Sequence, residues 1–221
     1  MIKEGSMYST ILFDLDGTLT DPGVGITNSV AYALNKWGIP VEDRASLCPF
    51  IGPPLKDSFM KYYGFSKEQA LQSVEYYREY FREKGLFEND LFTDTAWILK
   101  ELRNRGKTII LATSKPEEFA LTILRHFEIL EYFDLVAGAT MDETRNKKAD
   151  VIAYALKTAG VTDVSYAIMV GDREHDVLGA RQNGLSCIGV LFGYGSRKEL
   201  EDAGAVCIAE SFKDVLEYIE A

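Results

Sequence analysis

Short apolar runs of the kind that form buried strands recur along the chain. Several are apolar nearly throughout, as strands covered on both faces must be. The runs are residues 8–13, 107–112, 133–138, 166–171, 186–191 and 205–209. Helical patterns separate the later runs, at about 93–105, 116–127, 148–159, 175–183, 196–203 and 211–220. This alternation predicts an α/β fold in which helices cover a Rossmann-like parallel sheet.

The segment between the first two predicted strands breaks the alternation. It is about 95 residues long, whereas a βαβ unit needs only about 30. Residues 24–90 read as helical instead. Ser66 and Gln69 form a candidate capping box, and the helix that they begin is expected to end at Gly85.

We therefore predict two domains. Residues 1–22 and 92–221 form the α/β catalytic core, and residues 23–91 form an all-helical domain inserted after the first strand. The chain has no internal repeats and no low-complexity segments.

Composition narrows the classes of function. The 221 residues are 47% hydrophobic and carry a net charge of −10, which argues against a nucleic-acid surface. No apolar run approaches the roughly 20 residues needed to span a bilayer, and the N-terminus lacks the apolar middle of a signal peptide. The three cysteines contain no C-x-x-C pair and are interpreted as free thiols. We expect a cytoplasmic monomer or homodimer that binds a small molecule, and neither nucleic acid nor membrane.

Two acidic residues follow the first predicted strand directly. Asp14 and Asp16 are two positions apart, so in an extended segment their side chains point to the same side. The carboxyl ends of the strands are where open α/β sheets bind ligands. Crowded carboxylates repel each other, and we expect a cation, a shared proton or a reaction to offset that repulsion.

Other polar residues follow later strands. Thr113 ends the second strand, and Asp172 follows the fourth. Asp176 comes four residues after Asp172, at a helix start where negative charge is favourable. Ser114 has a competing interpretation, because with Glu117 it fits a capping box for the next helix.

Four segments resemble the four motifs of the haloacid dehalogenase superfamily of phosphotransferases. "DLDGTLTD" resembles the first motif, D-x-D-G-T-L-x-D, and "IILATSKP" is similar to the second. "NKKADVIAYAL" resembles the third, and "IMVGDREHD" resembles the fourth. The motifs occur in the family's order, and the helical insert resembles the family's C1 cap.

The resemblance implies a Mg²⁺-dependent phosphomonoester hydrolase. It implies that Asp14 is the nucleophile that forms an aspartyl-phosphate, and that Asp16 is the general acid and base. The implied Mg²⁺ ligands are Asp14, the backbone carbonyl of Asp16, and Asp172. Thr113 would bind a phosphoryl oxygen, and Lys148 would supply positive charge in the transition state.

The choice of lysine follows from helix register. Lys147 and Lys148 are adjacent, and the apolar pattern that follows favours Lys148. Asp176 could simply cap a helix, and His175 is interpreted as a residue of the site's rim because Mg²⁺ prefers oxygen ligands.

The substrate is the least constrained feature. Residues 50–59 look like the family's specificity loop, with Gly52 at its turn and Lys56 binding a distal anionic group. Ser114 is a further candidate contact. Leu55 stands where the β-phosphoglucomutase branch has arginine, and the segment looks closer to phosphoglycolate phosphatases and related nucleotidases.

Three alternatives stay open at this point. A 5′-nucleotidase or a pyrophosphatase would use the same motifs. A phospho-accepting signalling domain also uses acidic residues, a threonine and a lysine. Such a domain has about 120 residues and no insert, so the length of this chain and its early Asp14 argue against it.

Overall fold

The computed structural model describes residues 8–142 and 144–221. The chain divides into two compact units, one comprising residues up to Thr20 with Leu91–Ala221 and the other comprising Asp21–Asp90. The chain passes from one unit to the other at β2 (Thr20–Asp21) and β3 (Asp90–Leu91), which pair as a two-stranded sheet.

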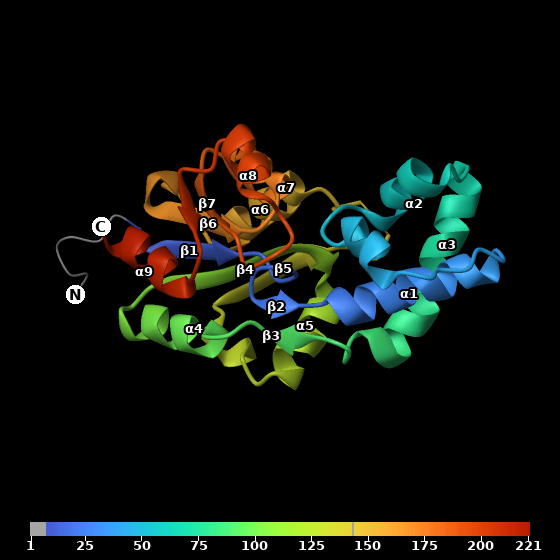
Figure 1. Ribbon diagram of the computed structural model, residues 1–221. Helices are drawn as coiled ribbons and strands as arrows, with labels where there is room; N and C mark the ends of the chain where they lie inside the picture. Colours follow the sequence, from blue (N-terminus) through green and yellow to red (C-terminus); the bar gives the residue numbers. More distant parts are fainter. Residues whose placement is uncertain (1–7, 143) are drawn as a thin grey trace. The chain divides into compact units, whose positions relative to one another are not determined.

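A six-stranded parallel sheet forms the centre of the larger unit (Figure 1). Its order is β5-β4-β1-β6-β7-β8, and each pair of neighbours is parallel. The strands are β1 (Thr10–Phe13), β4 (Thr108–Pro116), β5 (Leu135–Ala139), β6 (Ala167–Gly171), β7 (Ser186–Val190) and β8 (Cys207–Ala209). All six strands predicted from the apolar runs are confirmed, and so is the α/β fold.

Helices cover both faces of this sheet (Figure 1). The helices α6, α7 and α8 lie on one face, while α4, α5 and α9 lie on the other. Their bounds are α4 (Thr95–Asn104), α5 (Glu117–His126), α6 (Lys148–Thr158), α7 (Glu174–Gln182), α8 (Arg197–Ala203) and α9 (Phe212–Glu220). Two 3₁₀ turns, η3 (Leu130–Tyr132) and η4 (Val164–Tyr166), complete the unit.

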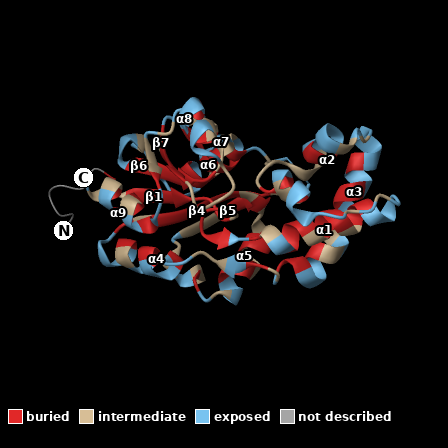
Figure 2. Cartoon of the chain, viewed as in Figure 1, coloured by how far each residue is buried: buried red, intermediate tan, exposed pale blue. Residues whose placement is uncertain are grey.

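The middle parts of the strands are apolar because both of their faces are covered. Leu12, Ile110 and Met169 come from three adjacent strands and are fully buried in one cluster with Ile152 of α6 and Val177 of α7. Figure 2 shows the sheet as a continuous buried layer. Burying one such side chain contributes roughly 1.5–3 kcal/mol, so this layer fixes the strands that carry the site.

The smaller unit is helical. It contains α1 (Gly23–Lys36), the 3₁₀ helix η1 (Arg44–Phe50), α2 (Leu55–Tyr63), α3 (Lys67–Tyr80) and a π-helical turn (Phe81–Gly85). The predicted capping box is confirmed, because Ser66 Oγ accepts from the Gln69 N–H at 3.2 Å and Gln69 Oε1 accepts from the Ser66 N–H at 2.9 Å.

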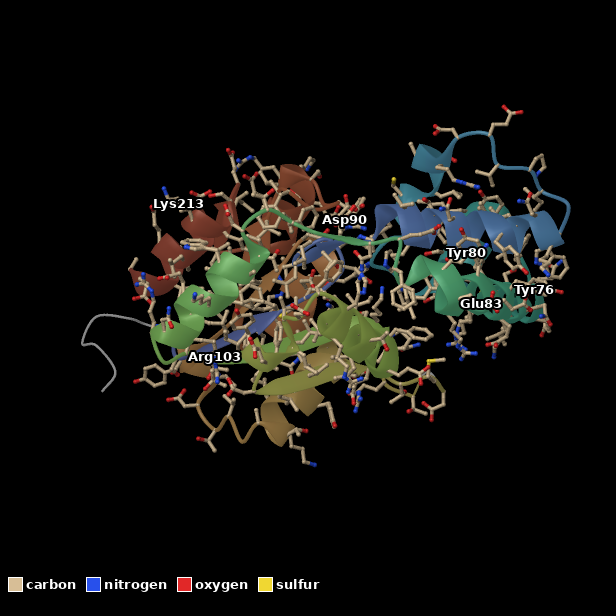
Figure 3. All side chains as sticks on the ribbon, turned by 90° about the horizontal axis from the view of Figure 1, so that it is seen from below. Tyr76, Tyr80, Glu83, Asp90, Arg103 and Lys213 are labelled. Carbon is tan, nitrogen blue, oxygen red and sulfur yellow. The ribbon has the colours of Figure 1, made fainter. Side chains whose placement is uncertain are left out.

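The helix α3 buries one side, with Ala70, Val74 and Tyr77, and exposes the other. Tyr76, Tyr80 and Glu83 can be followed along α3 and the turn after it in Figure 3. The Tyr80 hydroxyl donates to Glu88 at 2.9 Å, and its ring lies 5.6 Å from that of Tyr32 on α1. The ring contact joins α3 to α1, and the hydrogen bond joins α3 to the segment before β3.

The expectation of a loop over residues 50–59 is wrong in part. Only residues 51–54 form a loop, in which Gly52 has φ = 101°, and α2 begins at Leu55. Lys56 is therefore in the first turn of a helix. The start of α2 carries no capping signal, because its N-cap is Pro54 and no side chain caps it.

The three cysteines are free thiols, of which Cys187 is buried while Cys48 and Cys207 are partly exposed. Within the described residues, no helix has both the length and the apolar character that crossing a bilayer requires.

Candidate active site

The carboxyl ends of three adjacent strands place polar residues at one edge of the sheet. Asp14 follows β1, Thr113 lies in the last part of β4, and Asp172 follows β6. All three are buried, with exposed fractions of 5%, 1% and 0%. Polar side chains at such depth require partners, and those partners define the chemistry of the site.

Three carboxylates converge at this edge. Asp14, Asp172 and Asp176 each offer one oxygen, and these oxygens lie within 4.8 Å of one another. Two glycines permit the approach, because a Cβ at Gly17 would clash with the Asp172 carboxylate and a Cβ at Gly171 would clash with that of Asp176. Gly17 also has φ = 84°, which disfavours any other residue.

Lys148 bridges two of the carboxylates. Its Nζ lies 2.7 Å from Asp14 Oδ1 and 2.8 Å from Asp176 Oδ1, and it donates to the Ala112 carbonyl at 3.1 Å. Burial opposes the charged form, but Asp14 and Asp176 outweigh it and raise the pKa of Lys148 above its usual range. Lys147, in contrast, is exposed, so the structure brings only the second of the two candidate lysines into the site.

Asp176, whose role the sequence left open, is therefore part of the cluster. Its Oδ2 accepts from the Arg173 N–H at 3.1 Å, as a capping carboxylate does, while its Oδ1 faces Lys148. Its neighbour His175 is half-buried, and burial lowers the pKa of the imidazole.

Asp16 is paired with a lysine that the sequence interpretation missed. Lys115 Nζ lies 2.9 Å from Asp16 Oδ1 and 2.7 Å from Asp16 Oδ2. Burial raises the pKa of the Asp16 carboxyl, although Lys115 acts in the opposite direction. The available signal was spacing, because Lys115 is two positions after Thr113 and shares its side of an extended strand.

Thr113 and Ser114 differ in their surroundings. Thr113 is buried, and its hydroxyl oxygen accepts from the Lys115 N–H at 3.2 Å. Ser114 is only half-buried. The predicted capping box of Ser114 with Glu117 is wrong, because β4 continues to Pro116 and no side chain caps α5.

Glu117 instead binds the neighbouring strand. Its Oε2 accepts from the Gly138 N–H at 3.2 Å and from Arg145 at 3.1 Å. Through these two hydrogen bonds, the Glu117 carboxylate links the residue after β4 to β5 and to Arg145.

A glycine-rich turn after β7 holds Asp172. The Tyr194 N–H donates to Asp172 Oδ2 at 2.8 Å. A Cβ at Gly193 would clash with the Gly17 carbonyl, and one at Gly195 would clash with the Asp172 carbonyl. The other carboxylate oxygen, Asp172 Oδ1, is buried and accepts no hydrogen bond from the described part of the chain.

The charges of this site fit a divalent cation. Four carboxylates, those of Asp14, Asp16, Asp172 and Asp176, face two ammonium groups, which leaves two negative charges if all are ionised. Burial, with Asp176 and Asp14 nearby, raises the pKa of Asp172, and burial raises that of Asp176 to about 6. Together with the free Asp172 oxygen, this indicates a place for a cation with oxygen ligands.

The candidate residues do not all belong to this unit. Asp14, Asp16, Thr113, Lys148 and Asp172 lie at one edge of the core sheet, as described above. Gly52 and Lys56 belong to the helical unit, in the loop before α2 and in the first turn of α2.

The parallel sheet and its buried acidic edge define a Rossmann-like α/β core with a candidate cation site. Residues 11–190 match the family described as haloacid dehalogenase-like hydrolase, and the chain belongs to this family.

Known relatives agree with this assignment. The chain is 48% identical to a 5′-nucleotidase of Pseudomonas aeruginosa over 87% of each chain. It is 26% identical to a phosphoglycolate phosphatase of Photorhabdus laumondii, over 95% of this chain and 91% of the relative. A solved structure described as a predicted phosphatase from Clostridium acetobutylicum is 48% identical and has a TM-score of 0.92, covering 96% of this chain and 100% of the other. The chain is thus an enzyme of a hydrolase family with phosphatase relatives.

Proposed function

We propose that this enzyme is a Mg²⁺-dependent phosphomonoesterase that acts through an aspartyl-phosphate on Asp14. The observation that carries the proposal is the pairing of Asp14 with Lys148 beside Asp172 and Asp176 at the end of the sheet. A carboxylate nucleophile and an anionic ester repel each other, so the reaction requires positive charge at this place. Lys148 supplies one such charge.

The first half of the reaction transfers the phosphoryl group to the protein. Asp14 attacks phosphorus, the bond between phosphorus and the ester oxygen breaks, and the leaving oxygen takes a proton from Asp16. Thr113 donates a hydrogen bond to a phosphoryl oxygen. Lys148 balances the negative charge of the group in transit.

The second half restores the enzyme. Water attacks phosphorus and gives a proton to the Asp16 carboxylate, and the bond between phosphorus and Asp14 breaks. Inorganic phosphate leaves, with Asp14 ionised and Asp16 protonated again.

Asp14, Asp172 and the Asp16 backbone carbonyl would hold Mg²⁺. When bound, this ion supplies charge compensation between the nucleophile and the phosphoryl oxygens. The tether from the Tyr194 N–H to Asp172 keeps one carboxylate oxygen in place and leaves the other for the metal. Mg²⁺ demands well-fixed oxygen ligands, and this tether supplies such fixation.

The substrate is a small phosphorylated metabolite. The relative at 48% identity is named a 5′-nucleotidase, whereas the named phosphoglycolate phosphatase is at 26%. Nucleoside 5′-monophosphates are therefore our first candidate class, followed by phosphoglycolate. Gly52 and Lys56, together with Ser114, are proposed to read the part of the substrate beyond the phosphate.

The test is phosphate release from four compounds: a nucleoside 5′-monophosphate, phosphoglycolate, pyrophosphate and p-nitrophenyl phosphate. We expect hydrolysis of the esters that requires Mg²⁺, stops with EDTA and is lost in Asp14→Asn. Asp202→Asn is the matched control, because Asp202 is exposed in an ion pair with Lys198. Undiminished activity in Asp14→Asn would remove the covalent mechanism, and activity on pyrophosphate alone would remove the phosphomonoesterase.

A further inference from the structure

Lys115 is a buried lysine at the sheet edge that the steps above do not use. Its side chain is 4% exposed, and that of Asp16 is 12% exposed. Both Asp16 oxygens lie within 2.9 Å of Lys115 Nζ, so the ammonium contacts both atoms of the carboxylate and not only one. Desolvation opposes burial of such a pair, so close contact through both carboxylate oxygens is needed to hold it.

The local backbone explains how Lys115 reaches this place. The register of β4 against β5 shifts between Ala112 and Pro116, so the chain leaves the regular ladder where it carries Thr113 and Lys115. The Lys115 N–H donates to the Thr113 hydroxyl oxygen at 3.2 Å. The segment 113–115 therefore orients both the proposed phosphoryl-binding hydroxyl of Thr113 and Lys115, the partner of Asp16.

We propose that Lys115 is a positioning residue that holds the Asp16 carboxyl group where it exchanges protons with the leaving oxygen and with water. This inference rests on the proposed function, in which Asp16 is the general acid. The two lysines at the site then divide the work, because Lys148 contacts Asp14 and Asp176 whereas Lys115 contacts Asp16.

The contact of Lys115 with both Asp16 oxygens indicates positioning, because it restricts rotation of the Asp16 side chain. An aspartate can rotate about two bonds. Rotation of the ionised Asp16 away from Lys115 would separate two buried opposite charges, and rotation of the protonated Asp16 would lose the hydrogen bond that the same ammonium donates. A general acid works only within hydrogen-bond reach of its target, so a misplaced Asp16 loses proton transfer while the nucleophile and the metal ligands stay in place.

The inference makes a prediction that depends on the leaving group. Alkyl phosphates need a proton on the departing oxygen, whereas p-nitrophenolate leaves without one. The ratio kcat/KM reports the first half of the reaction, up to departure of the leaving group, and is unaffected by the later attack of water. Loss of positioning should therefore lower kcat/KM for alkyl esters far more than for p-nitrophenyl phosphate.

The experiment compares kcat/KM for a series of phosphate esters whose leaving groups range from alkyl alcohols to p-nitrophenol. The proteins are the wild type, Lys115→Met, Lys115→Arg, Asp16→Asn and the double variant Lys115→Met with Asp16→Asn. Lys198→Met is the matched control, because its ammonium is exposed in an ion pair with Asp202. Circular dichroism and urea unfolding establish that each variant is folded.

General acids contribute about 10²–10⁴ in rate. For Lys115→Met we expect a loss of about 10–100-fold on alkyl esters and less than about 3-fold on p-nitrophenyl phosphate. Lys115→Arg should recover part of the alkyl activity. In the Asp16→Asn background, Lys115→Met should have no further effect, and this double variant leaves no unpaired charge that could prevent folding.

Three outcomes would overturn the inference. A uniform loss across all esters would make Lys115 a structural residue. Additive losses in the double variant would show that it acts apart from Asp16. If Asp16→Asn itself treats alkyl and aryl esters alike, the proposed role of Asp16 fails and the inference fails with it. If Asp16→Asn shows the leaving-group effect while Lys115→Met shows a uniform loss, the proposed role of Asp16 stands and only the inference fails.

Discussion

Replacing Asp172 by asparagine should stabilise the metal-free protein, although the same change should abolish catalysis. Asp172 is fully buried, and its carboxylate lies in one cluster with Asp14 and Asp176. Asparagine has nearly the same shape, and its carbonyl oxygen still accepts from the Tyr194 N–H. The substitution therefore removes mainly a charge.

The magnitude follows from the spacing of the cluster. The three oxygens lie within 4.8 Å of one another, and two like charges at that separation repel by about 3.5 kcal/mol at an effective dielectric constant of about 20. Asp172 has two such neighbours, while Lys148 offsets part of their charge. The pKa values of Asp172 itself and of Asp176 are raised, so partial protonation of both carboxyl groups offsets more. We expect a gain of about 1–3 kcal/mol in the free energy of unfolding without metal, or about 3–10 °C in Tm for a chain of this size.

The assay is thermal and urea unfolding of the wild type and Asp172→Asn, in EDTA and in Mg²⁺. In EDTA the variant should be the more stable protein. Mg²⁺ should stabilise the wild type, because it binds only the folded site, and should stabilise the variant much less. Asp202→Asn should change neither result.

Two results would refute the reasoning. If Asp172→Asn is less stable than the wild type in EDTA, repulsion between Asp172 and the neighbouring carboxylates does not destabilise the metal-free fold. If Mg²⁺ stabilises both proteins equally, Asp172 is not a ligand.

Three further predictions follow. Lys148→Met leaves Asp14 and Asp176 without their shared cation, so it should lower the free energy of unfolding by about 3–5 kcal/mol and abolish activity. An effect as small as that of Lys198→Met would contradict the bridging role. The pKa of Asp176 is raised from 3.8 to about 6, so between these values the folded state binds a proton that the unfolded state has lost. In EDTA, the free energy of unfolding of the wild type relative to Asp176→Asn should therefore fall as pH rises from about 4 to about 6. A difference that does not depend on pH would contradict that shift. Lys56→Ala should lower kcat/KM for esters with a second anionic group and spare p-nitrophenyl phosphate; an equal loss on every ester would exclude a role in specificity.

The sheet was predictable because its signal is local. A strand covered on both faces must be apolar throughout, so the run over residues 166–171 indicated β6 without any knowledge of its neighbours. Parallel strands then carry their carboxyl ends to one edge. Asp14 and Asp172 follow two such strands, and the family resemblance places both in one metal site.

The pairings within the site were not predictable in this way. Lys115 and Asp16 are 99 positions apart, and nothing in either segment states that they meet. Ser114 and Glu117 fit a capping box by local sequence, but Glu117 instead accepts a hydrogen bond from Gly138 of β5, which is distant in sequence. The start of α2 has no local capping signal, because its N-cap is Pro54 and no side chain caps it, so residues 55–59 could be read as part of a loop.

The most direct test of the account is a search for the phosphorylated enzyme. The wild type and Asp14→Asn are mixed with ³²P-labelled p-nitrophenyl phosphate and Mg²⁺, quenched with acid within milliseconds, and digested for peptide mapping. The account predicts a label in the wild type that hydroxylamine removes, that lies in the peptide containing Asp14, and that is absent from Asp14→Asn. Turnover by the wild type without such a label, or a label on another peptide, would contradict the aspartyl-phosphate mechanism.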